Sequence, residues 1–273
     1  MEQPSSPGRS PVDYRKCIEE ALKFILESHI NQTLELDLGL SKDLCSFLLT
    51  HDVPLTAGSS DTESQYPLYK RLASVFRESV TSTASCGAFS NIASLNEDDD
   101  LKKREDWGKL VLKEGSEMIE LLKTVNFELH VQEPYFTQLK DGLKTVEGRC
   151  AVGDYNRIGS GSLILCNKCL VLKVQDVHGY LSFSEMLQAE SLAKVLPGIK
   201  TIDEGVQVYR RFYTEEKEKT NGVIAICVTK PAAQPFLCLA RILSVSLLIT
   251  SRLSYGGLQS LLGLTDRTTT TTE

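Results

Sequence analysis

The residues best suited to do chemistry together lie between Tyr135 and Arg149. Lys144, Glu147 and Arg149 supply an ammonium, a carboxylate and a guanidinium in one short stretch, and Tyr135 adds an aromatic ring upstream. A carboxylate and a guanidinium two residues apart on one strand face can pair with each other or can hold a polar ligand together. By residue type alone, a solvated strand with a surface ion pair is the simpler interpretation, and these four side chains are the best candidates for a site.

A strand, helix, strand unit must position these side chains. Residues 128–131 are predicted to form a short strand, a helix that includes Tyr135 follows Pro134, and residues 143–150 are predicted to be extended. Because side chains alternate along a strand, Glu147 and Arg149 share one face and Lys144 points to the other. A site that uses all three requires a bend or a bulge near Lys144.

The same stretch carries a family resemblance. A run of the form G-x-K-x-x-E-x-R is made by four residues, Gly142, Lys144, Glu147 and Arg149. With Pro134-Tyr135 upstream, and in its strand-helix-strand context, this run resembles the signature of the ASCH domain over residues 126–230. The resemblance implies an α+β chain with a PUA-like small β-barrel and flanking helices. It also implies that Tyr135, Lys144, Glu147 and Arg149 line a cleft between the barrel and a helix that suits a nucleotide or an RNA strand. In that cleft the two cations would contact a phosphate or a base edge, the carboxylate would accept from an amine, and the ring would offer a stacking face.

The resemblance favours a non-catalytic protein that binds single-stranded RNA or a nucleotide, such as a coactivator or an accessory factor of RNA metabolism. An alternative comes from small ASCH-like amidohydrolases of acylated cytidine, which use a lysine and a threonine three positions later. Lys144 matches that lysine, but Glu147 stands at the threonine position. A hydrolase would use Lys144 and Glu147; otherwise no catalytic residue is assigned, and the binding function is preferred to an enzyme.

No metal site or cofactor is expected. Cys166 and Cys169 form a C-x-x-C pair, but a structural zinc site needs four ligands and the sequence has no second such pair. We interpret both cysteines as ordinary residues in or beside buried strands. The pair His178-Gly179 is predicted to mark a hairpin turn.

Two helices are predicted after this turn. Residues 182–185 and 201–204 both fit the S/T-x-x-E capping box, in which Ser182 and Thr201 are the caps. The first helix is predicted to end before Pro197-Gly198, and the second near Asn221-Gly222. A short buried strand, residues 223–229, is predicted to follow.

The composition favours two domains. The chain has 273 residues, 41% of them apolar, enough for one good core and a second small core. The net charge of −6 and the pI of about 5.4 exclude proteins that coat nucleic acid by bulk electrostatics. Residues 126–231 carry 13 basic and 13 acidic side chains, so a nucleic acid contact must be local and of modest affinity.

The predicted organisation has four parts: a disordered tail of residues 1–11, a helical region of residues 12–125 with loops at 52–65 and 81–100, the ASCH domain of residues 126–231, and a C-terminal helical segment with a disordered tail of residues 232–273. The acidic run 97–100 is interpreted as a linker in preference to its alternative, a helix N-terminus stabilised by negative charge. The amphipathic helices of residues 12–125 suit a protein partner, which is the third functional hypothesis.

The compartment is expected to be reducing, either cytoplasmic or nuclear. Eight cysteines are scattered without the density of a disulfide scaffold, and the chain opens without a secretory signal. The most apolar stretch, residues 235–250, is too short to span a bilayer and contains Arg241. No membrane partner is therefore expected.

Overall fold

The computed structural model describes residues 12–50, 52–53, 66–81 and 97–250. The predicted tail of residues 1–11 lies outside these residues, as does most of the two predicted loops and of the C-terminal tail. The chain divides into two compact units, one that contains Leu121–Gln234 and one that combines Asp13–Glu120 with Pro235–Glu273. Each unit is described by itself.

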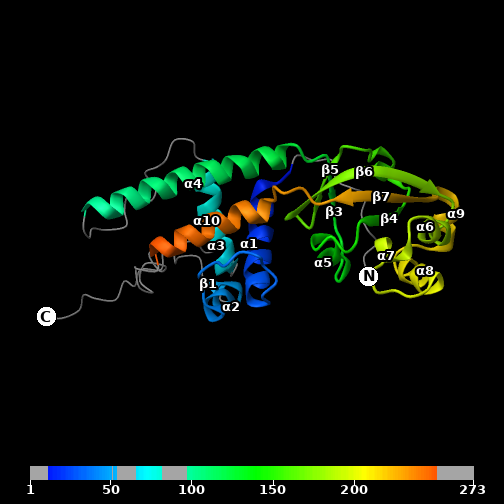
Figure 1. Cartoon of the computed structure of the whole chain (residues 1–273), viewed down its shortest axis with the longest axis horizontal. Coiled ribbons are helices and arrows are strands. Elements are labelled where there is room, and N and C mark those ends of the chain that lie inside the picture. Colours follow the sequence, from blue (N-terminus) through cyan, green and yellow to red (C-terminus); the bar gives the residue numbers. More distant parts are fainter. Residues whose placement is uncertain (1–11, 51, 54–65, 82–96, 251–273) are drawn as a thin grey trace, which may run out of the picture. The chain divides into compact units, whose positions relative to one another are not determined.

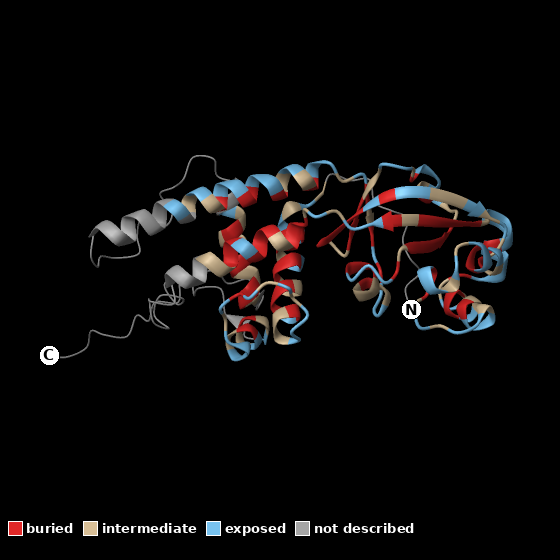
Figure 2. Cartoon of the chain, viewed as in Figure 1, coloured by how far each residue is buried: buried red, intermediate tan, exposed pale blue. Residues whose placement is uncertain are grey.

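The unit of Asp13–Glu120 and Pro235–Glu273 is built mainly from helices (Figure 1). Their bounds are α1 Tyr14–Ile30, α2 Lys42–Thr50, α3 Leu68–Thr81, α4 Glu97–Lys123 and α10 Pro235–Thr250. Helix α1 begins at an Asp13 cap whose carboxylate accepts from two backbone N–H groups. It packs against α2, α3 and α10, and Figure 2 shows buried positions along α1, α3 and α10. The helical prediction for this region is confirmed.

Two details of this unit differ from the prediction. Strands β1 Asp52–Val53 and β2 Tyr66–Pro67 form a two-residue antiparallel pair that was not expected. The linker interpretation of the acidic run is wrong, because α4 already begins at Glu97. Carboxylates in the first helical turn are stabilised by the helix dipole, so an acidic run can begin a helix as well as form a linker.

The other unit contains a five-stranded sheet in the order β3-β5-β6-β7-β4. The strands are β3 Phe127–Leu129, β4 Val146–Cys150, β5 Leu163–Cys166, β6 Leu170–Tyr180 and β7 Val223–Thr229. Strands β3 and β5 are parallel, and the other pairs are antiparallel. The sheet curls into a half-barrel, with β3 and β4 at its edges (Figure 1). This is the predicted α+β fold, with the barrel left open.

Helices cover part of this sheet. They are α5 Tyr135–Lys140, the 3-10 helix η1 Gly153–Arg157, α6 Phe183–Ala189, α7 Leu192–Val195, α8 Ile202–Arg210 and α9 Glu215–Asn221. The two helices predicted between β6 and β7 are therefore four. The first break falls at Ser191, whose φ of 71° is incompatible with a continuing helix, and Thr214 caps a new helix after the second break. The capping box of Thr201 and Glu204 is complete, as predicted.

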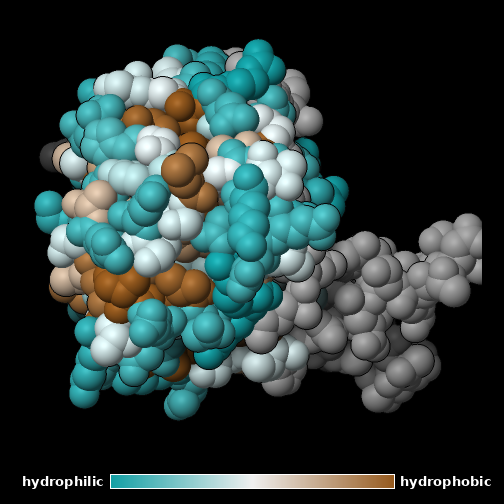
Figure 3. Space-filling view, turned by 90° about the vertical axis from the view of Figure 1, so that its right-hand side faces the viewer, coloured by the Kyte–Doolittle hydropathy of each residue, from teal (hydrophilic) through white to brown (hydrophobic). Residues whose placement is uncertain are grey.

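The core of this unit lies where α6 and α8 meet β4 and β7. Phe183 of α6 stacks on Tyr209 of α8 with ring centroids 4.1 Å apart, and both pack with Met186, Val146 and Ala225. Figure 3 shows an outer face of the protein on which hydrophilic side chains surround separate apolar areas. The close packing fixes α8 against β4, the strand that carries the candidate residues.

The hairpin turn predicted at His178-Gly179 is wrong. Strand β6 continues to Tyr180, and both residues pair with β7, His178 opposite Ala225 and Gly179 opposite Ile224. The histidine-glycine pair suggested a turn by composition, but pairing to a central strand overrides local preference. Among the described helices, none combines the length and the apolar character needed to cross a membrane.

Candidate functional site

A turn before β4 brings Lys144 to the other charged candidates. Gly142 has a φ of +74° after α5, and the N–H groups of Leu143 and Lys144 both donate to the carbonyl of Gln138. Strand β4 then begins only at Val146. Lys144 therefore lies outside the strand, and the alternation that separated it from Glu147 does not apply to it. The bend that the sequence required is present.

Glu147 lies between the two cations. Its Oε2 is 3.1 Å from the Nζ of Lys144, and its Oε1 accepts from the Nε of Arg149 at 2.8 Å. Lys144 also donates to the carbonyls of Val146, at 2.7 Å, and of Val195. Each charge therefore has a partner in the part of the chain that the structure describes.

Burial makes this pairing necessary. Lys144 is 2% exposed, Arg149 5% and Glu147 9%, and an unpaired charge at such depth is strongly unfavourable. Arg149 is further held by its Nη2, which donates to the carbonyl of His130 at 2.9 Å. That bond links β4 to the segment between β3 and α5.

The pKa values follow from burial and pairing. Burial lowers the pKa of Lys144, although the Glu147 carboxylate opposes that shift. Burial alone would raise the pKa of Glu147, but Lys144 and Arg149 outweigh burial and hold it below its ordinary value. Burial acts to lower the pKa of Arg149, and Glu147 more than offsets this and raises it. Glu147 is therefore ionised at neutral pH, and Arg149 stays charged.

Aromatic rings surround the charged group. The Nζ of Lys144 lies 5.8 Å from the ring centroid of Tyr135, and the guanidinium of Arg149 lies 5.9 Å from that of Tyr155. These distances are within the range of cation–π attraction. The buried hydroxyl of Tyr213 lies beside the Arg149 guanidinium.

These side chains share a pocket of about 600 Å³. It is lined by His130, Val131, Gln132, Tyr135, Lys144, Glu147, Gly148, Arg149, Leu196, Val208, Tyr209, Phe212 and Tyr213. All four candidates from the sequence are among them. His130 and Gln132 are exposed, and Tyr135 and Phe212 are half-buried, so these four residues offer surface that a ligand can reach.

The aromatic residues at the end of α8 and just after it were not among the candidates. Tyr209, Phe212 and Tyr213 recur at spacings of three and four, which places them on one side of a helical segment. That spacing was a usable indication of an aromatic surface. Their position opposite β4 depends on tertiary packing, which one sequence does not give.

The cysteine pair occupies strand ends. Cys166 is the last residue of β5 and Cys169 directly precedes β6, and both are buried. Burial raises the pKa of Cys166 to about 12, so its thiol stays protonated at neutral pH. The interpretation as buried residues in or beside strands is confirmed.

Comparison with known proteins gives the family. The family model described as the ASCH domain matches residues 129–232. The crystal structure of hypothetical protein PH0355 is 43% identical over 38% of this chain and 97% of that chain, with a TM-score of 0.38. The solution NMR structure of protein PF0455 from Pyrococcus furiosus is 42% identical over 39% of this chain and 97% of that chain, with a TM-score of 0.36. No curated protein matches the chain. Through residues 129–232 the chain belongs to the ASCH domain family, which has the PUA-like fold.

Proposed function

We propose that the ASCH domain binds single-stranded RNA or a nucleotide in the pocket between β4 and α8, and that it does so without catalysis. The observation that carries the proposal is one pocket in which paired buried charges lie beside reachable aromatic rings. ASCH domains are generally RNA-binding. The domain of residues 126–231 is the proposed binding unit.

The charge and ring content of the pocket suits this ligand class. Lys144 and Arg149 against Glu147 leave one net positive charge, which favours an anion over a neutral metabolite. Glu147 and His130 use two of the five N–H groups of the Arg149 guanidinium. The guanidinium also interacts with the hydroxyls of Tyr155 and Tyr213, and its positive charge suits a phosphate or a base edge, while Tyr135 and Phe212 supply stacking faces.

The amidohydrolase remains a second candidate, because burial lowers the pKa of Lys144 next to a carboxylate, an arrangement common at catalytic centres. Against it, the Nζ of Lys144 is held by two backbone carbonyls and Glu147. An ammonium with three acceptors has no lone pair to offer. Incubation with N4-acetylcytidine decides between the two: turnover by the wild type that exceeds turnover by Lys144→Ala would establish the hydrolase.

The binding proposal is tested with the full chain and a fluorescent single-stranded RNA of mixed sequence, by anisotropy at near-physiological salt. Tyr135→Ala and Phe212→Ala are each expected to weaken binding by about 5- to 150-fold, the range for loss of one stacked base. Tyr135→Phe keeps the ring and should bind like the wild type. Equal affinity of the alanine variants and the wild type would contradict the proposal.

The helical region of residues 12–125 is proposed to bind a protein partner, as in a coactivator, in the cytoplasm or the nucleus. Leu112 of α4 is 46% exposed, which gives this region a large apolar side chain on its surface. Five described cysteines, Cys45, Cys150, Cys166, Cys227 and Cys238, are free thiols, which suits a reducing compartment. Affinity capture with the chain, with and without residues 12–125, tests the partner proposal.

A further inference from the structure

A second cluster of reactive side chains lies on β6, on β7 and at the end of α6. A register shift between Val174 and Asp176 precedes pairing of Asp176 with Cys227 and of His178 with Ala225. Residues two apart on a strand share a face, so Asp176, His178 and Cys227 project to one side of the sheet. Glu190, the residue that ends α6, reaches that same side.

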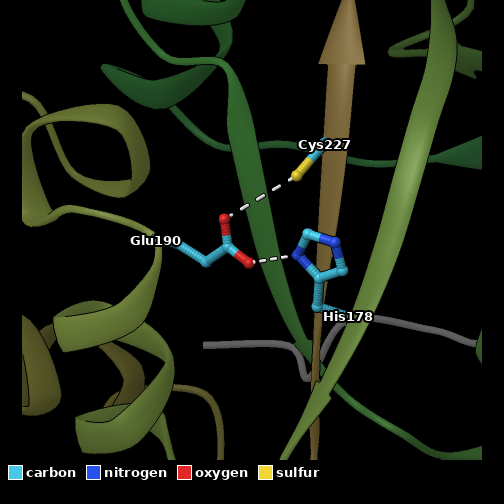
Figure 4. Close-up of side chains that lie close together, drawn as sticks. All are labelled: His178, Glu190 and Cys227. Atoms are coloured by element: carbon cyan, nitrogen blue, oxygen red, sulfur yellow. Dashed lines mark hydrogen bonds and ion pairs between the residues drawn. The ribbon is translucent and has the colours of Figure 1, made fainter.

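The potential ligand atoms of this cluster converge (Figure 4). The Nδ1 of His178 lies 2.5 Å from the Oε1 of Glu190, and the Sγ of Cys227 lies 3.8 Å from the Oε2 of Glu190. All three ligand atoms lie within 4.8 Å of one another. His178 and Glu190 come from positions twelve residues apart, and Cys227 comes from the neighbouring strand.

The geometry points to a Zn²⁺ site formed by His178 Nδ1, the Glu190 carboxylate and Cys227 Sγ, with one coordination position left for water. One nitrogen, one oxygen and one sulfur ligand suit zinc and do not suit Mg²⁺ or Ca²⁺, which prefer oxygen ligands alone. With a neutral imidazole, the carboxylate and a thiolate balance the two charges of the ion. Ligand atoms around tetrahedral zinc lie roughly 3.3 to 3.8 Å apart, so the 2.5 Å contact between His178 Nδ1 and Glu190 Oε1 has to open when the ion enters.

The outer hydrogen bonds typical of a metal site are already present. The Nε2 of His178 lies 3.1 Å from the Oδ2 of Asp176, the arrangement in which a carboxylate orients a ligating imidazole. The hydroxyl of Tyr180 donates to the Oε1 of Glu190 at 2.6 Å. Both bonds hold proposed ligand side chains in place.

Zinc competes with protons at this site. Binding displaces the Nδ1 hydrogen of a protonated His178 and the thiol hydrogen of Cys227, and both leave as protons. Hydrogen bonds to Glu190 and Asp176 raise the pKa of His178. Burial and then Glu190 raise the pKa of Cys227 to about 11, against a smaller opposing effect of Lys194. Zinc affinity is therefore expected to increase with pH.

The test uses the full chain, stripped with a chelator and titrated with Co²⁺ as a spectroscopic substitute for Zn²⁺. The wild type should bind one Co²⁺ with the strong visible bands of tetrahedral coordination and a thiolate-to-cobalt charge-transfer band, and Zn²⁺ should remove both. Cys227→Ser should lose the charge-transfer band, and His178→Gln should lose the tetrahedral spectrum. Asp176→Asn should weaken binding by about 10- to 100-fold, as expected for an outer-shell carboxylate.

Two matched controls exclude other sites. Cys169→Ser removes a cysteine of the C-x-x-C pair, and His130→Gln removes a histidine of the pocket; both should keep the wild-type cobalt spectrum. Far-ultraviolet circular dichroism checks the fold of each variant. If Cys227→Ser fails to fold, the cobalt spectra of the wild type and of His178→Gln still test whether the metal site exists. The inference would be overturned if the wild type gave the spectrum of free Co²⁺. It would also be overturned if His178→Gln kept the tetrahedral visible bands, or if Cys169→Ser lost the charge-transfer band.

Discussion

The ASCH domain contains two clusters in which a glutamate lies between two partner side chains, one in the pocket and one on β6 and β7. The two clusters differ in burial. In the pocket, Glu147 joins Lys144 and Arg149, all at most 9% exposed. In the second cluster, Glu190 joins Cys227 and His178, whose side chain is 43% exposed. In the pocket cluster the two cations donate to backbone carbonyls as well as to Glu147. The second cluster contains an imidazole and a thiol, which are groups that can gain or lose a proton.

The difference indicates a division of roles. A buried pair must remain paired, because breaking it exposes the remaining charge to a medium of low polarity. The pocket cluster therefore keeps a constant shape and charge, as a preformed binding site requires. In the second cluster the His178 side chain is partly exposed, so a change in its protonation carries a smaller penalty, which suits the proposed metal site.

The largest predicted difference concerns the two kinds of glutamate ion pair. Glu147→Gln leaves Lys144 and Arg149 without a carboxylate and should lower the free energy of unfolding by about 3–5 kcal/mol. Glu128→Gln removes the carboxylate that pairs with Lys168 where both side chains are partly exposed, and should cost less than about 1 kcal/mol. Urea denaturation followed by the near-ultraviolet circular dichroism of the tyrosines measures both. Equal losses of unfolding free energy in the two variants would contradict the predicted difference between a buried and a partly exposed ion pair.

The next effect concerns the backbone between the two charged residues of β4. A Cβ at Gly148 would lie 2.5 Å from the hydroxyl of Tyr209 and 2.6 Å from the Cε of Met186. Gly148→Ala should therefore cost about 1–3 kcal/mol of unfolding free energy and weaken RNA binding. Gly179→Ala in β6 meets nothing within 4 Å and is the control. Wild-type stability of Gly148→Ala would show that α8 is not packed closely on β4.

A smaller effect is expected at the start of α8, the helix that carries Tyr209 into the pocket. Thr201→Ala removes the side chain that accepts from the N–H of Glu204, and loss of such a cap costs about 1 kcal/mol. Thr220→Ala changes an exposed threonine inside α9, and it should be close to neutral. Thermal denaturation of both variants checks this, and a larger loss for Thr220→Ala would contradict it.

The smallest predicted effect is a pH dependence of stability that comes from His178 in the second cluster. Because the pKa of His178 is raised in the folded state, its contribution to stability is complete below about 6.5 and is lost as the pH rises through the folded value. An NMR titration of the His178 ring should have its midpoint above 6.5, and Glu190→Gln should lower that midpoint. A midpoint that does not move in Glu190→Gln would show that the two side chains do not interact in solution.

The sequence predicted the parts of this molecule that depend on local chemistry. The order of strands and helices, the Thr201 cap and the grouping of Tyr135, Lys144, Glu147 and Arg149 in one stretch all follow from residue types and spacing. The cluster of His178, Glu190 and Cys227 does not, because it depends on a register shift in β6 and on strand pairing over long separations. The same pairing explains why His178-Gly179 was misread as a turn.

The central claim, that the pocket of the ASCH domain binds RNA, is tested most directly by photocrosslinking. The full chain is irradiated with a single-stranded RNA that contains 4-thiouridine, and the crosslinked peptides are sequenced by mass spectrometry. Adducts are predicted on Tyr135, Phe212 or their immediate neighbours, and competition with unlabelled RNA should remove them. Adducts confined to residues 12–120 would contradict the claim and assign RNA binding to the helical unit.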